Sequence, residues 1–196
     1  MKDFGTTVIS VDATFKDKET GDFVAIEVWS KRGVDYYLRY LINKRLDFPK
    51  TLEAIGTVMR LFPEVRYVLI EDKANGSAII QTLQSRIHGV IGINPKGGKV
   101  SRVNAIAPAV ESGHVYLPQD ATFAEEFIDQ FTAFPASEHD DMVDAASQCL
   151  NWMIFVKGGR DLPSAKEQRL LREASEAQEA IYSNEIYDVY NRGAMG

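Results

Sequence analysis

Three acidic clusters stand at the ends of apolar segments of the chain. They are Asp12, the pair Glu71 and Asp72, and the group Asp140, Asp141 and Asp144. Carboxylate oxygens are the ligands that hard cations such as Mg²⁺ and Mn²⁺ prefer. If the three segments meet at one edge of a sheet, the sequence predicts a divalent-cation centre suited to metal-assisted hydrolysis.

Each acidic cluster also has a simpler structural explanation. Asp12 fits a turn after a strand, and the pair Glu71 and Asp72 precedes Gly76, which is typical of a helix entry. An acidic first turn stabilises a helix through its dipole, which accounts for Asp140 or Asp141. The conjunction of all three clusters favours metal binding over these separate explanations.

Helical geometry ranks the acids of the last cluster. Steps of about 100° per residue place Asp140, Asp141 and Asp144 on one face of a helix, opposite Cys149. Asp141 lies nearest the apolar side of that helix. We therefore expect Asp141 to face the sheet as the principal ligand, and Asp140 and Asp144 to lie closer to solvent.

Four basic residues flank the acidic clusters in the sequence: Lys73, Lys96, Lys99 and Arg102. Gly97 and Gly98 would let the backbone approach a phosphate closely. These side chains are candidate DNA contacts, with solvated loop charges as the alternative.

The elements that must position these residues follow two patterns. Alternating and β-branched segments at Thr7 to Ala13, Phe23 to Ser30 and Tyr36 to Ile42 predict an antiparallel meander. Helices and strands then alternate. We expect helices after Pro49, after Gly76, over 103–110, over 123–131 and over 140–155, and strands over 67–70, 90–93 and 115–117. The fold class is therefore α/β, with a mixed sheet whose first three strands are antiparallel and later strands parallel, flanked by helices.

Composition narrows the class of protein. The 196 residues predict one domain over 1–160 and a charged tail over 161–196 that is helical or partly disordered. The net charge of −6 argues against a basic coat over the whole surface. A single cysteine, Cys149, excludes an intrachain disulfide and a cysteine-based zinc site. No apolar run approaches membrane-spanning length.

Three strings resemble the nuclease domain of phage large terminase subunits: LIEDKANGSAII, KGGKVSRVNAIAPAVESGHVYLP and EHDDMVDAASQCLNW. The resemblance extends from Val8 to Phe155. It implies a ribonuclease H-like fold, shared with resolvases and integrases. It also implies catalytic acids at Asp12, at Glu71 or Asp72, and at the Asp140 and Asp141 pair. Asp144 is a second-tier ligand, because its spacing from Asp141 resembles the paired aspartates of resolvases.

The resemblance also implies an activity. It is endonucleolytic cleavage of double-stranded DNA during viral genome packaging, with two Mg²⁺ or Mn²⁺ ions bridged by Asp12. The implied partners are the ATPase domain of the same large subunit, the small terminase subunit and the portal protein, in the cytoplasm of the host cell. The chain contains no GxxxxGK[ST] phosphate loop, so we expect no ATP hydrolysis from it.

Two other classes of function stay open. A resolvase or a ribonuclease H would keep the fold and change the substrate to a four-way junction or an RNA–DNA hybrid. A non-catalytic module of the packaging complex would use the acids as helix caps and the charged tail to dock a partner.

Overall fold

A six-stranded mixed sheet forms the centre of the computed structural model, which describes residues 4–13, 22–72, 76–137 and 139–155. The strands are β1 (Thr6–Ala13), β2 (Asp22–Arg32), β3 (Asp35–Leu46), β4 (Val65–Glu71), β5 (Val90–Ile93) and β6 (Val115–Tyr116). Their order in the sheet is β5-β4-β1-β2-β3-β6. The first three strands pair antiparallel, and β4, β5 and β6 each pair parallel with a neighbour. The predicted fold class is confirmed.

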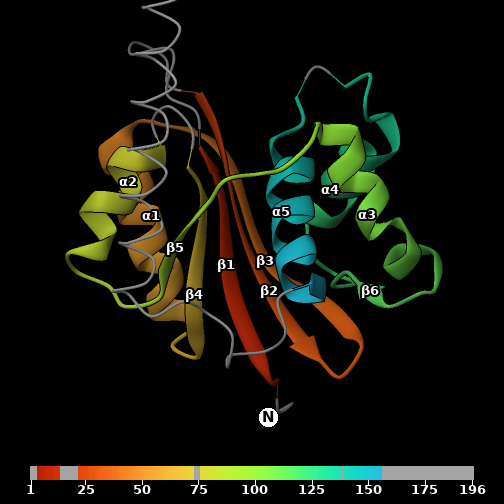
Figure 1. Cartoon of the computed structure of the whole chain (residues 1–196), viewed down its shortest axis with the longest axis horizontal. Coiled ribbons are helices and arrows are strands. Elements are labelled where there is room, and N and C mark those ends of the chain that lie inside the picture. Colours follow the sequence, from red (N-terminus) through yellow and green to blue (C-terminus); the bar gives the residue numbers. More distant parts are fainter. Residues whose placement is uncertain (1–3, 14–21, 73–75, 138, 156–196) are drawn as a thin grey trace, which may run out of the picture. The chain divides into compact units, whose positions relative to one another are not determined.

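Helices cover both faces of the sheet (Figure 1). They are α1 (Phe48–Leu61), α2 (Gly76–Gln84), α3 (Lys99–Glu111), α4 (Phe123–Ala133) and α5 (Asp141–Phe155). α1 and α2 lie on one face, and α3, α4 and α5 lie on the other (Figure 1). The strands alternate accordingly: Val8 packs on the α5 side, whereas Ile9 packs on the α1 side.

The helix α5 is covered almost all round. Every residue from 142 to 150 is buried, because α5 lies between the sheet and the two helices α3 and α4. Polar contacts fix the position of α5 along β1. The Ser10 hydroxyl donates to the Ala145 carbonyl at 2.7 Å, and the Gln148 amide donates to the Ser10 hydroxyl at 3.0 Å. The side-chain oxygen of Gln130 accepts from the Met142 and Val143 amides and so caps the start of α5.

Two predicted boundaries were wrong by four residues each. β3 extends to Leu46 because β2 pairs with it along its whole length, from Asp22 opposite Leu46 onward. α3 begins at Lys99 and not at the predicted Val103, because Gly97 at φ +80° and the N-cap Gly98 turn the chain into the helix. The predicted tail over 161–196 lies outside the described residues. Within the described ranges, no helix is both long and apolar enough to cross a membrane.

Candidate metal centre

The parallel pairing of β1 and β4 brings Asp12 and Glu71 side by side. Val11 is the register partner of Ile70, so the next residue on each strand, Asp12 and Glu71, lies at the same edge of the sheet. Both lie on the α5 side, because the apolar residues before them, Val11 and Ile70, face α1 and α2.

Asp72 lies on the opposite side from Asp12. Its carboxylate accepts a 2.6 Å hydrogen bond from the Ser77 hydroxyl of α2, and it also lies beside Gly92 of β5. Of the two neighbouring acids that the sequence left open, Glu71 is therefore the one that the fold places with Asp12. Asp72 is placed against α2.

α5 supplies the next two acids. Asp144 is 5% exposed and Asp141 is partly buried. The expectation that Asp144 lies close to solvent was wrong. The polar face of α5 meets α3 instead of water, and α3 carries the basic residues that pair with this aspartate.

Asp12 is buried and lies within the influence of the other three acids. The pKa of Asp12 is raised from 3.8 to about 8, first by burial and then by the charges of Asp144, Glu71 and Asp141, against the opposing charge of Lys99. Burial also raises the pKa of Asp141, with Asp140 adding to the rise. Carboxylates that repel one another in a partly dry setting gain stability from any cation placed among them.

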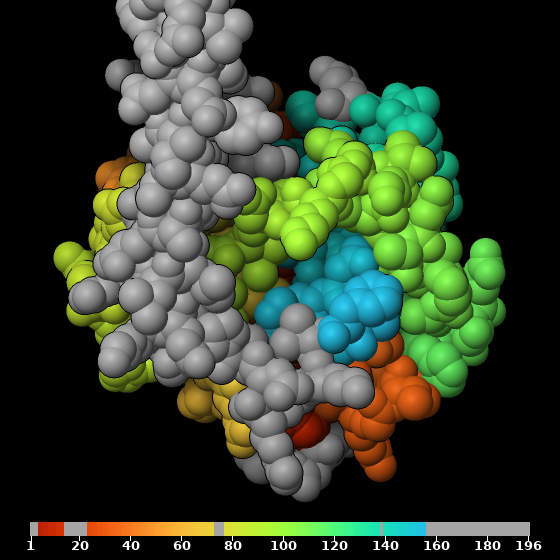
Figure 2. All heavy atoms as spheres, viewed as in Figure 1, coloured from red at the N-terminus to blue at the C-terminus, as the bar shows by residue number. Residues whose placement is uncertain are grey.

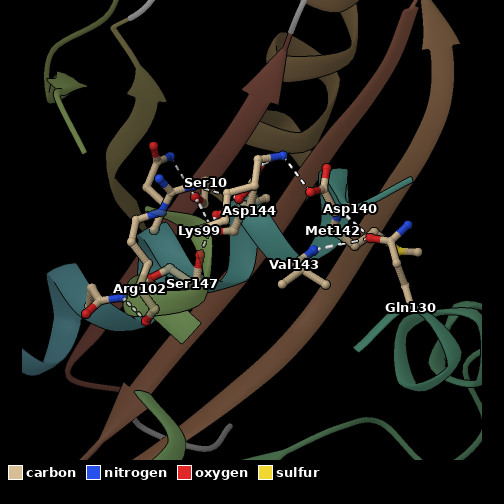
Figure 3. A network of polar contacts seen from close by, with 12 residues as sticks. Ser10, Lys99, Arg102, Gln130, Asp140, Met142, Val143, Asp144 and Ser147 are labelled. Atoms are coloured by element: carbon tan, nitrogen blue, oxygen red, sulfur yellow. Dashed lines mark hydrogen bonds and ion pairs between the residues drawn. The ribbon is translucent and has the colours of Figure 1, made fainter. Parts of the chain in front are cut away.

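Two basic side chains from α3 reach into this cluster (Figure 3). The Lys99 ammonium lies 2.6 Å from an oxygen of Asp140 and 2.7 Å from an oxygen of Asp144. The Arg102 guanidinium lies 2.6 Å from the other Asp144 oxygen. Burial lowers the pKa of Lys99, but its hydrogen bonds to the two aspartates outweigh that effect and raise the pKa.

The four predicted DNA contacts are placed differently. Lys73 lies outside the described residues, and Lys96 is exposed in the loop between β5 and α3. Lys99 is about half exposed, whereas the Arg102 side chain is only 10% exposed and is engaged with Asp144. Arg102 thus offers little surface to DNA, and its guanidinium instead neutralises the buried Asp144.

The donor set fits a hard divalent cation, because Asp12, Glu71, Asp141 and Asp144 offer carboxylate oxygens on one side of the sheet. Among the described residues, however, no three acidic, histidine or cysteine side chains are already placed to hold an ion together. The Lys99 ammonium supplies the positive charge between Asp140 and Asp144. A bound cation would therefore require these side chains to rearrange.

Glu27 is a further acid that sequence reasoning missed. It is fully buried on β2, and the Trp29 indole donates to one of its oxygens at 2.6 Å. Burial raises the pKa of Glu27 well above 4.5, and the charge of Asp12 adds to the rise. The alternation of β2 could have identified it, because Glu27 stands between the buried apolar residues Ala25 and Trp29 on the same face of the strand.

The sheet order, the helices on both faces and the acids at the ends of β1 and β4 define a ribonuclease H-like fold. The family described as the terminase RNaseH-like domain matches residues 9–152. This chain belongs to that family. A comparison with curated proteins found no significant match.

Solved structures of viral terminases share the fold. A large terminase from a thermophilic bacteriophage aligns with a TM-score of 0.61 and 13% identity, over 79% of this chain and 42% of that one. The large terminase nuclease of thermophilic phage G20c, with bound zinc, aligns with a TM-score of 0.57 and 16% identity, over 76% of this chain and 80% of that one. The human cytomegalovirus terminase nuclease domain, soaked with manganese and inhibitor-bound, aligns with a TM-score of 0.55 and 15% identity, over 78% of this chain and 85% of that one. The chain thus spans about two fifths of the first of these proteins.

Proposed function

We propose that this chain is a divalent-metal-dependent endonuclease domain that cuts double-stranded DNA during viral genome packaging. The observation that carries the proposal is the convergence of Asp12, Glu71, Asp141 and Asp144 on one side of the sheet, where burial and the three neighbouring charges raise the pKa of Asp12. The family and the metals named for the G20c and cytomegalovirus nucleases support it.

In this proposal Asp12, Glu71 and Asp141 hold two Mg²⁺ or Mn²⁺ ions, with Asp140 and Asp144 beside them. Bound cations would supply the Lewis acidity for attack of water on a phosphodiester. Asp12 is the central group, because its strand end is flanked by Glu71 on β4 and by the acids of α5. Lys96 and Lys99, near the N-terminus of α3, contact phosphates of the DNA, as does Lys73.

Membership of the same family supports a proposal for the biological setting. The thermophilic bacteriophage's large terminase aligns over less than half of its length, and structures of it in complex with ADP and with ATP-gamma-S are known. We therefore propose that this domain works with an ATPase domain of a large terminase subunit, together with a small subunit and a portal, in the host cytoplasm.

The test is cleavage of linear and supercoiled duplex DNA with Mg²⁺ or Mn²⁺, alongside a four-way junction and an RNA–DNA hybrid. Duplex cleavage that EDTA abolishes and that Asp12→Asn reduces by about a hundredfold or more would support the proposal. An Asp12→Asn protein as active as wild type would contradict it. Preference for the junction or the hybrid would instead assign a resolvase or a ribonuclease H.

A further inference from the structure

The ammonium of Lys99 is the most displaceable charge in the acidic cluster. It lies 2.6 Å from Asp140 and 2.7 Å from Asp144, yet its side chain is 47% exposed. One turn later on α3, the guanidinium of Arg102 holds the other oxygen of Asp144 with only 10% of its side chain exposed. Asp144 therefore has one buried cationic partner, Arg102, and one half-exposed partner, Lys99, that can leave it.

Lys99 is also well placed to move. It is the first residue of α3, directly after Gly97 and Gly98, and the N-cap Gly98 makes no side-chain hydrogen bond that would fix this end of the helix. The segment that leads from β5 into α3 passes in front of α5 at the surface of the molecule (Figure 2). An exposed lysine has many rotamers, so its ammonium can leave the two aspartates without unfolding the helix.

We propose that Lys99 is a built-in counter-ion of the metal centre, which a divalent cation must displace from Asp140 and Asp144 before it binds. The inference rests on the proposed function, because it concerns the same carboxylates. A divalent ion among these acids would meet the ammonium at short range, so binding must overcome like-charge repulsion and break two ion pairs. Lys99 thus weakens metal binding in the free protein, and its released ammonium becomes available to a phosphate.

The experiment compares Mn²⁺ binding to the full chain by calorimetry at pH 8 without DNA. Lys99→Met should bind Mn²⁺ about tenfold more tightly than wild type, a change that corresponds to about 1.4 kcal/mol. Lys99→Arg keeps the charge and should bind like wild type. Lys50→Met is the matched control, because it removes an equal charge from an exposed lysine of α1 that pairs with the N-cap Asp47, on the other face of the sheet.

The outcomes separate this inference from the proposed function. If Lys99→Met binds Mn²⁺ no more tightly than wild type while wild type binds the metal and cuts DNA, the counter-ion role is wrong and the nuclease stands. If neither protein binds Mn²⁺ and neither cuts, both proposals fall. A similar gain in affinity for Lys50→Met would show a general charge effect and would also overturn the role of Lys99. Thermal unfolding of each variant confirms that it is folded.

Discussion

The guanidinium of Arg102 on α3 lies 2.6 Å from the carboxylate of Asp144 on α5, and both side chains are at least nine-tenths buried. Asn151 of α5 adds a second tie, because its side-chain amide donates to the Arg102 carbonyl at 2.9 Å. The helix that carries two of the acids is thereby joined to the helix that carries their cationic partners. The geometry of the candidate metal centre depends on this pair.

Arg102→Met should therefore destabilise the protein. It leaves Asp144 buried with Lys99 alone, which we expect to lower the free energy of unfolding by about 2–3 kcal/mol. Urea denaturation at neutral pH measures the loss. Combining Arg102→Met with Asp144→Asn should cost clearly less than the sum of the two single changes. Strict additivity would mean that the ion pair contributes nothing to stability.

Asp12 should make the metal-free protein less stable as the pH rises. Its pKa is about 8 in the folded protein and near 3.8 when unfolded, so between these values the folded state holds a proton that the unfolded chain releases. The free energy of unfolding must then fall as the pH rises through this window. Asp12→Asn removes this contribution and should be more stable than wild type at pH 9, by more than about 1 kcal/mol.

The measurement is chemical denaturation in EDTA at several pH values from 5 to 9. An Asp12→Asn protein with the same pH dependence as wild type would show that the proton resides elsewhere. Adding Mn²⁺ should stabilise wild type more at pH 8 than at pH 6, because metal binding requires the ionised carboxylate.

The neighbours Glu71 and Asp72 should behave differently when each is neutralised. Glu71→Gln removes a carboxylate from the Asp12 side and should abolish Mn²⁺ binding and DNA cleavage. Asp72→Asn keeps an oxygen that can accept the Ser77 hydroxyl, so it should retain cleavage and lose about 1 kcal/mol of stability at most. Parallel assays of both variants decide the assignment, and the opposite result would place Asp72 in the centre.

Much of the fold was predictable because its patterns are local. The strand after Pro63 reads as a continuous apolar run because helices cover both of its faces. Pro49 stands at the start of α1 and Gly76 at the start of α2. The pairing of Asp12 with Glu71 was not predictable, because a strand's alternation shows that Glu71 and Asp72 face opposite sides but not which side faces α5. That information lies in the register of β1 with β4.

The burial of Asp144 was missed for a related reason. Helical periodicity correctly grouped the acids of α5 on one face, but a polar face was expected to meet water. The partner that covers it, Arg102, lies 42 residues earlier in the chain. Only the tertiary arrangement of α3 on α5 places the two together, and no local pattern contains it.

Glu27 is a second buried carboxyl for which pH should matter. One of its oxygens accepts from the Trp29 indole, and the other has no hydrogen-bond partner among the described atoms. A fully buried carboxylate is very unfavourable in this setting, so burial raises the pKa of Glu27 well above 4.5 and favours its protonated form. The folded state again holds a proton that the unfolded chain releases above about pH 4.5.

Glu27→Gln is therefore the informative substitution, because an amide has the shape of the protonated acid and can still accept from Trp29. We expect it to match wild type within about 1 kcal/mol at pH 5 and to be more stable at pH 9, where wild type loses the stability linked to this proton. Glu27→Ala should cost about 2 kcal/mol or more at both pH values, because it leaves a cavity beside the indole. Adding Glu27→Gln to Asp12→Asn should remove most of the remaining pH dependence above pH 5 and leave the smaller contribution of Asp141, whose pKa is also raised. If the double variant still loses stability steeply toward pH 9, the two carboxyls do not hold the protons, since each would have been replaced by a group that cannot titrate.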